Sequence, residues 1–343
     1  MNKIFNQKPV SNLSTETKNI ILKIFKKIAL LIFPLYIVWF LYVKYLPIFF
    51  NEANNSHWVS IKQTSENQVK IPYPEILFLG ESRVNAGVDF TQISNCYSYA
   101  AGGSTPIEMY YVLKKYLKTH AKPKKIFVSI SPRFLSEIFA FFPNAVQNDF
   151  FTFSEIEEIA RVKSRFEQDT LFGKYFWGRC LLYQLKYPGF YQPEVSRSYG
   201  FTAYSDNKKM NLRIAELHGG RDHPGLKATS SALNYETKYQ NFKPSPILDF
   251  YLNLIFRTCR MKKIDLIFDF MPVNESSYRN LKSEFVQNYR SYISKYAGRY
   301  PEFQISDTVY FYPDSLFGDE SHLNFKGKEK FTKYLKTKYF RND

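Results

Sequence analysis

An apolar segment near the amino terminus places the first constraint on this chain. Residues Ile28–Val43 carry no charge over sixteen positions, and the apolar run continues to Phe50 with Lys44 as its one charged residue. A helix of that extended length rises about 34 Å, which is enough to cross a hydrocarbon core of about 30 Å. We therefore expect residues 28–50 to form a transmembrane anchor. A cleaved signal peptide and a buried helix are the alternatives, but no small-residue cleavage site follows the run cleanly.

The charges that flank this segment predict its orientation. Residues 1–27 carry six lysines and one glutamate, whereas only Lys44 lies close after the apolar run. The positive-inside rule then makes residues 1–27 a cytoplasmic basic tail and places residues 51–343 outside the cytoplasm.

The overall composition excludes some partners. The formal net charge is +16, but the sequence contains no zinc-finger spacing, RNP motif or arginine-rich helix, so we expect no nucleic-acid partner. A basic surface also suits a membrane or an anionic polymer. Cys96, Cys180 and Cys259 lie far apart without metal-ligand spacing, and we expect three buried thiols.

The rest of the chain divides into a short linker and one folded body. Residues 51–70 are polar and are interpreted as a juxtamembrane linker, and the body spans residues 71–343. Strands are expected at 75–79, 96–100, 125–130 and 264–270, with helices at 105–118, 246–260, 281–296 and 325–340. Strands that alternate with helices predict an α/β fold, a three-layer α/β/α sandwich with a parallel sheet. The first helix carries a clear start signal, because Thr105, Pro106 and Glu108 form a capping box.

Residues 134–245 fit this alternation poorly. They are rich in aromatic residues and contain short helical pieces, so we expect a mainly helical insertion over the carboxyl edge of the sheet. The insertion is either a helical elaboration of the core or a cap that walls a site, since sites in open α/β sheets lie at the carboxyl ends of the strands.

Two short motifs carry candidate chemistry. Ser82 follows the first predicted strand at once, and Asp319 and His322 form an Asp-x-x-His motif before the last helix. A serine nucleophile needs a histidine base, and the histidine needs a carboxylate that orients it. Each motif alone is weak, because Ser82 could cap a helix, Asp319 could cap a turn and His322 could lie in a core.

The order of these motifs resembles that of the SGNH (GDSL-type) hydrolase superfamily over residues 74–133 and 246–340. Gly80-Glu81-Ser82 resembles the family's Gly-Asp-Ser block, with Glu81 in place of the aspartate. Gly103 resembles the second block, whose glycine amide contributes to the oxyanion hole. Asp319 and His322 resemble the fifth block. The resemblance implies that Ser82, His322 and Asp319 are catalytic, that the amides of Ser82 and Gly103 form the oxyanion hole, and that no cofactor or metal is needed.

The third block departs from the family pattern. The family offers an asparagine that donates to the oxyanion, whereas this chain has Ser131-Pro132-Arg133. That ending, together with Asn274 after a later strand, is similar to membrane-anchored envelope members, such as the D-alanine transfer protein and alginate O-acetyltransferases. Ser131, Arg133 and Asn274 are therefore candidates for the missing donor or for substrate contacts, as are Glu81 and Arg83.

The remaining histidines lack such a context. His218 and His223 flank Asp222 in a way that could suggest a metal site, but their glycine-rich, polar loop is more typical of a solvated surface. His57 and His120 stand alone.

The resemblance and the anchor together predict a membrane-anchored serine esterase or O-acyltransferase. We expect it in the bacterial cytoplasmic membrane, with an extracytoplasmic catalytic domain that acts on acyl esters of envelope glycans. The membrane and a membrane acyltransferase are its expected partners. Two alternatives stay open: an inactive scaffold of an envelope polysaccharide assembly, and a membrane-facing lipid esterase.

Overall fold

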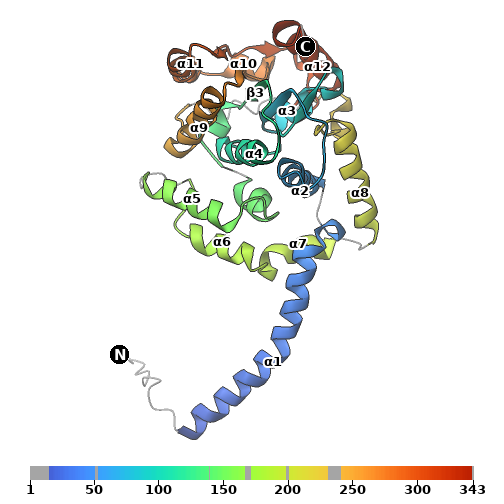
Figure 1. The fold of residues 1–343 in the computed structure, drawn as a ribbon, viewed down its shortest axis with the longest axis vertical. Helices are drawn as coiled ribbons and strands as arrows, with labels where there is room; N and C mark the ends of the chain where they lie inside the picture. Colours follow the sequence, from blue (N-terminus) through green and yellow to red (C-terminus); the bar gives the residue numbers. More distant parts are fainter. Residues whose placement is uncertain are drawn as a thin grey trace, which may run out of the picture.

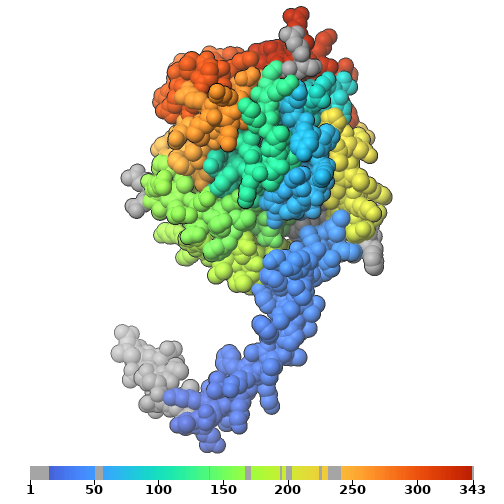
Figure 2. All heavy atoms as spheres, viewed as in Figure 1, coloured from blue at the N-terminus to red at the C-terminus, as the bar shows by residue number. Residues whose placement is uncertain are grey.

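The structure, a computed structural model, describes residues 15–50, 53–138, 140–166, 171–197, 201–230 and 241–341. Within these ranges, one long helix projects from a body of helices and strands (Figures 1 and 2). Residues 1–14 of the expected basic tail and residues 51–52 of the expected linker lie outside the described residues.

The centre of the body is a five-stranded parallel sheet with the order β2-β1-β3-β4-β6. Its strands are β1 (Ile76–Gly80), β2 (Cys96–Ser98), β3 (Lys125–Ser129), β4 (Asp265–Phe268) and β6 (Gln304–Ile305). The expected α/β class is confirmed, and so are the four expected strands. The strand β6 was not expected, because two residues carry no readable periodicity. A second, two-stranded sheet pairs β5 (Val273–Asn274) with β7 (Phe311–Tyr312).

Apolar cores cover both faces of the sheet. Alternate residues of β1 face opposite sides, so Leu77 and Leu79 join one core while Ile76 and Phe78 join the other. The first core is built with α4 (Pro106–Thr119), α9 (Pro246–Lys262) and α11 (Ser283–Arg299). The second is built with α3 (Ser82–Gly87) and α12 (Phe325–Tyr339). Burial on both faces explains why the strands are continuously apolar in sequence.

Side-chain caps set the starts of two helices near the sheet's carboxyl edge. The expected capping box of α4 is confirmed, since Thr105 caps the helix and Glu108 accepts a hydrogen bond from the Thr105 N–H at 2.8 Å. Asn324 caps α12 and accepts from the Gly327 N–H at 3.0 Å.

A buried carboxylate fastens α12 to the sheet. Asp269 follows β4 and is fully buried. It accepts hydrogen bonds from the hydroxyls of Tyr334 at 2.9 Å and Tyr339 at 2.7 Å, and from the Lys338 ammonium at 3.2 Å. The network holds the second half of α12, the helix that follows the Asp-x-x-His motif.

The insertion is mainly helical in its described part. It contains a π-helix at Phe141–Val146, α5 (Phe153–Ser164), α6 (Phe176–Gln184), α7 (Pro188–Arg197) and α8 (Phe201–Glu216). The helices α5, α6 and α7 form the end of the body from which the long helix leaves, and α8 runs up one side of the body (Figure 1). Cys180 of α6, like Cys96 and Cys259, is a buried free thiol, as expected.

The amino-terminal helix α1 spans Thr15–Tyr45 and is long and apolar enough to cross a membrane. Its most apolar window has a mean hydropathy of 2.0 and is not buried by the rest of the protein. The helix ends five residues before the expected anchor does. A proline at position 47 starts a separate short 3-10 helix (Pro47–Phe49), and Phe50 is buried against the body.

The expected linker is instead largely helical. Helix α2 (Ala53–Ser65) lies between α4 and α8 (Figure 1). Trp58 and Ile61 are only 1 % and 2 % exposed. The polar composition of this stretch predicts a solvated segment, but His57, Thr64 and Ser65 are buried, and the His57 side chain makes hydrogen bonds to distant parts of the chain.

Candidate active site

The candidate nucleophile lies at the carboxyl end of the central strand. Gly80 ends β1, and a Cβ there would lie 2.4 Å from Val84, so the turn into α3 requires glycine. Glu81 caps α3 and accepts a hydrogen bond from the Arg83 N–H at 2.8 Å. Ser82 is thus the first residue of a helix held tightly against the sheet.

The structure brings Ser82, His322 and Asp319 together. His322 Nε2 lies 2.8 Å from Ser82 Oγ, and His322 Nδ1 lies 2.8 Å from Asp319 Oδ2. Since the carboxylate can only accept, the imidazole proton lies on Nδ1 and leaves Nε2 free to accept the serine proton. This is the arrangement that a Ser-His-Asp triad requires.

Asp319 is held in its charged form. Its Oδ1 accepts hydrogen bonds from the N–H groups of Ser321 at 2.8 Å and His322 at 2.7 Å. Partial burial on its own would raise the pKa of this carboxyl, but the hydrogen bonds from His322 and the backbone outweigh it and lower the pKa to about 2.

A buried ion pair lies beside the candidate nucleophile. Glu81 and Arg83 are 1 % and 3 % exposed, and Arg83 Nε lies 3.8 Å from Glu81 Oε1. Burial lowers the pKa of Arg83, while Glu81 and Asp319 oppose this shift. The other oxygen of Glu81 lies 3.1 Å from Ser82 Oγ, so the serine hydroxyl has a second acceptor besides His322.

Two cavities meet at Ser82 and His322, which line both. The first has a volume of about 400 Å³, and its lining includes Gly103, Asn144, Arg221 and His223. The second has a volume of about 460 Å³, and its lining includes Glu81, Arg83, Phe134, Asp319 and Glu320. A larger cavity of about 850 Å³ lies between α8 and α12 and is lined by no triad residue. The site is therefore open on two sides of the candidate nucleophile.

Gly103 lies in a tight turn beside the insertion. Its φ is +73°, and a Cβ there would lie 2.3 Å from the side chain of Ala140. Among the described residues, neither the Gly103 N–H nor the Ser82 N–H has a hydrogen-bond acceptor. Both groups are thus available to a negatively charged oxygen in the first cavity.

Three other residues, Ser131, Arg133 and Asn274, are candidate oxyanion donors from the sequence. None of them lines either cavity. Both ends of the Asn274 amide serve the fold, since it donates to the Glu320 carbonyl at 2.8 Å and accepts from the Ser277 N–H at 2.7 Å. Ser131 is buried at the start of a short 3-10 helix, and Arg133 lies 3.6 Å from Glu137.

Asn144 lines the first cavity, whereas Ser131, Arg133 and Asn274 do not. The sequence alone does not predict this residue. It belongs to the π-helix of the insertion and lines the first cavity with Ser82 and Gly103. Its Nδ2 donates to the Gly102 carbonyl at a long 3.4 Å. No local signal marks this asparagine, because its approach to Gly103 depends on how the insertion folds back.

His57 connects α2 to the site. Its Nε2 lies 3.1 Å from the Gly219 carbonyl, which can only accept, so the proton lies on Nε2. Its Nδ1 then accepts from Asn85 Nδ2 of α3 at 3.2 Å, and that amide also donates to the Ala100 carbonyl. Burial lowers the pKa of His57 to about 4, so the side chain is neutral near pH 7. A stretch that composition assigns to a linker thus supports the helix that starts with Ser82.

The loop around Gly219 is not a solvated surface, contrary to expectation. The His218 carbonyl accepts from the Ser98 N–H at 2.8 Å, so the loop continues the pairing at the β2 edge. Gly219 has a φ of +81°, and a Cβ there would lie 2.1 Å from the Ser98 carbonyl oxygen. His223 then stacks near His322, with 6.0 Å between ring centres. Burial, aided by the charges of His322 and Arg221, lowers the pKa of His223 to about 3.

The described residues hold no group of three metal-ligating side chains. His218 and His223 therefore do not form a metal site with Asp222 in this part of the chain. Asp222 instead pairs with Arg213, with Oδ2 2.6 Å from Nε.

No family profile matches the sequence, and no curated protein matches it.

The buried His57 predicts an acid-sensitive fold. The unfolded chain binds a proton at this imidazole near pH 6.5 and the folded chain at about 4, so stability is complete above pH 6.5 and is lost as the pH falls towards 4. The loss is on the order of 3 kcal/mol. His57→Gln keeps one donor and one acceptor but cannot titrate, so the thermal midpoint of the full chain in detergent should fall less between these pH values than that of the wild type.

The matched control is His120→Gln, which removes a partly buried histidine at the end of α4. Burial also lowers the pKa of His120, but this side chain is much less buried than His57, so His120→Gln should remove a smaller part of the acid sensitivity than His57→Gln does. If His57→Gln and the wild type lose stability equally between pH 6.5 and 4, the neutral, buried state assigned to His57 is wrong.

Proposed function

We propose that this protein is a membrane-anchored serine esterase or O-acyltransferase of the SGNH type, with its sheet and helices arranged as a three-layer α/β/α sandwich. The observation that carries the proposal is the chain of contacts from Ser82 Oγ through the His322 ring to Asp319, each 2.8 Å long. A non-catalytic scaffold has no need of an ionised carboxylate, an oriented imidazole and a serine in line, with open cavities on both sides.

The proposed reaction begins with acyl transfer to the enzyme. Ser82 Oγ attacks the ester carbonyl carbon while His322 Nε2 takes the hydroxyl proton. Asp319 stays ionised and stabilises the imidazolium ion. The carbonyl oxygen becomes an oxyanion that receives hydrogen bonds from the Ser82 and Gly103 N–H groups. Collapse of the intermediate breaks the bond to the alcohol, which leaves with the proton from His322.

The second half of the reaction decides between hydrolysis and transfer. Water or a sugar hydroxyl attacks the acyl group on Ser82, His322 takes its proton, and Ser82 recovers that proton as the product leaves. The two cavities that meet at Ser82 and His322 suit this scheme, because the acyl group and the alcohol lie on different sides of the reacting carbon.

The anchor and the charge pattern support the proposed location. Helix α1 can cross a membrane, and lysines are concentrated before its apolar run. We infer that the amino terminus is cytoplasmic and that the body faces the envelope of a bacterial cell, where acyl esters of glycans are the substrates. A membrane acyltransferase is the proposed protein partner.

Substitution of the nucleophile tests the proposal. Ser82→Ala should lower turnover of a short-chain chromogenic ester by at least about 10³-fold, because triad members act as a unit. Ser129→Ala is the matched control, since Ser129 ends the neighbouring strand β3, pairs with Gly80 and lines neither cavity. It should keep near wild-type turnover. Equal activity of the two variants would rule out Ser82 as the nucleophile.

We further infer that Asn144 replaces the oxyanion donor that the third block lacks. One of its amide protons points towards Gly102, and the second is available to the cavity that contains Ser82 and Gly103. Asn144→Ala should therefore lower kcat by about 10²-fold with little change in KM, because the contact exists only in the transition state.

Asn148→Ala is the control for this variant, because Asn148 lies one helical turn further on and does not line the first cavity. It should leave kcat unchanged. An unaltered kcat in Asn144→Ala would leave the oxyanion hole to the two backbone amides alone.

A further inference from the structure

Helix α6 carries large apolar side chains on its exposed face as well as on its buried face. Phe176, Cys180 and Tyr183 of this helix point into the body. The neighbouring face of the helix forms an exposed apolar stripe. The exposed fractions of its side chains are 47 % for Trp177, 53 % for Leu181, 36 % for Leu182 and 45 % for Leu185. Tyr175 and Tyr187 extend it at 79 % and 47 % exposure. We call residues 175–187 the elbow. Single exposed apolar residues are ordinary, but a continuous stripe of this kind marks a contact surface.

Of the two charged residues of the elbow, Lys186 is buried and Arg179 is exposed. Lys186 is 2 % exposed, and its Nζ lies 2.8 Å from both carboxylate oxygens of Asp149. Arg179 lies with its guanidinium carbon 3.8 Å from the centre of the Phe142 ring. The outward side of the elbow is thus mainly apolar, and its exposed charge, Arg179, lies against an aromatic ring of the body.

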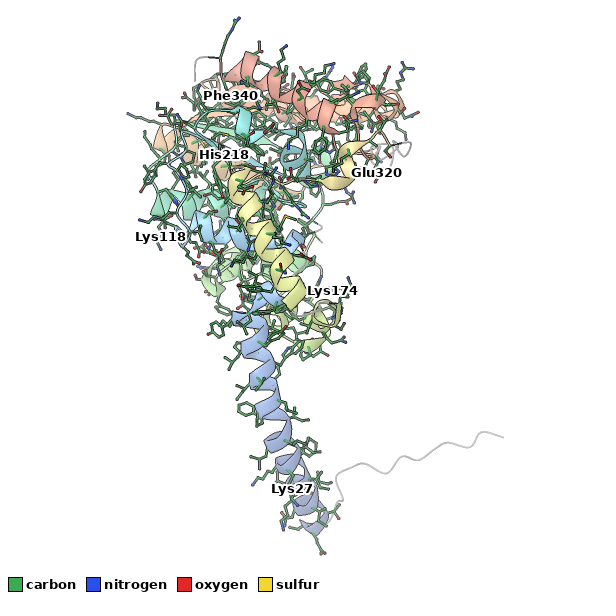
Figure 3. All side chains as sticks on the ribbon, turned by 90° about the vertical axis from the view of Figure 1, so that its right-hand side faces the viewer. Lys27, Lys118, Lys174, His218, Glu320 and Phe340 are labelled. Atoms are coloured by element: carbon green, nitrogen blue, oxygen red, sulfur yellow. The ribbon has the colours of Figure 1, made fainter. Side chains whose placement is uncertain are left out.

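The elbow is joined directly to the membrane-spanning helix. Trp39 Nε1 of α1 donates to the Lys186 carbonyl at 2.8 Å, and the Tyr36 hydroxyl donates to the Leu185 carbonyl. Figure 1 shows α6 and α7 beside the upper part of α1, and Figure 3 shows Lys174 at the same end of the body, with Lys27 at the far end of α1.

The position of these contacts along α1 sets the depth of the elbow. Ile28–Tyr36 contains nine residues, which rise about 13 Å of a hydrocarbon core of about 30 Å. If Lys26 and Lys27 snorkel to the inner boundary, the hydrocarbon core begins roughly one turn earlier, and Tyr36 lies about 5 Å further from that boundary. More than a third of the apolar thickness therefore remains beyond the level at which the elbow contacts α1.

A different position of α1 in the bilayer would leave the elbow in water, but it would bury charged side chains in the lipid. If Tyr36 marked the outer boundary, about twenty residues before it would span the bilayer. That placement would bring Lys23, Lys26 and Lys27 to the centre of the membrane. A lysine there costs about 2.5–3.5 kcal/mol on insertion scales. The charges of α1 thus favour the deeper seating of the elbow.

We propose that the elbow is a second membrane contact, inserted in the lipid of the outer leaflet beside α1. Its stripe of tryptophan, tyrosine and leucine is the composition that favours the boundary between headgroups and acyl chains. Together with α1 it fixes the depth and tilt of the body relative to the membrane. The body then has a defined orientation on the lipid surface, which a single membrane helix would not give it. This proposal depends on α1 spanning the bilayer and is independent of any activity at Ser82.

A nitroxide label on a single introduced cysteine tests the proposal. The full chain carries three native cysteines, all buried, so mild labelling goes to the introduced one and the unsubstituted chain gives the background. Leu181→Cys places the label on the stripe. Phe325→Cys is the control, because Phe325 is 44 % exposed on α12, at the end of the body opposite α1 (Figure 1). Both are reconstituted in vesicles of phosphatidylcholine and phosphatidylglycerol.

The readout is the collision of each label with oxygen, which concentrates in lipid, and with a water-soluble nickel chelate. We expect the ratio of oxygen to nickel accessibility to be severalfold higher at position 181 than at position 325. Equal ratios would place the elbow in water and overturn the proposal. Protection of position 181 from both reagents would also overturn it, because a second copy of the chain would then cover the stripe. Trp177→Cys repeats the measurement one turn away.

Discussion

The parallel pairing of β1 with β2 and β3 is the constraint on which the candidate site depends. Parallel strands bring their carboxyl ends to one edge of the sheet. In the order β2-β1-β3, the second strand lies on one side of β1 and the third strand lies on the other. Ser82 follows the central strand, and the turn with Gly103 follows β2, so both residues line one cavity. A shift of register in either pairing would separate them.

The contact between His322 and Ser82 joins segments 240 residues apart. Such a contact needs both partners to be positioned by the fold, since nothing local holds them together. On one side, Glu81 caps α3 and His57 supports it through Asn85. On the other, the buried Asp269 fixes the last turns of α12 to the end of β4. The residues of the candidate site thus come from both ends of the body, and contacts to the fold position each side.

Local patterns predict the elements that satisfy their own constraints. The apolar run of β1, the capping box at Thr105 and the Asp-x-x-His motif all appear within a few residues, and the structure contains each of them. Helix α2 and the loop with Gly219 are different, because their polar residues are buried only through partners far along the chain. Asn144 is missed for the same reason. Sequence reasoning therefore places the triad residues in one constellation but not the residues that line the cavity around them.

Covalent labelling tests whether Ser82, His322 and Asp319 form one working unit. The full-length protein in detergent is treated with a fluorophosphonate, and the adduct is located by mass spectrometry. We expect one phosphonyl group on Ser82 in the wild type and loss of labelling in His322→Ala, since the hydroxyl is then no longer activated. A wild-type protein that never labels, or an adduct on another serine, would contradict it.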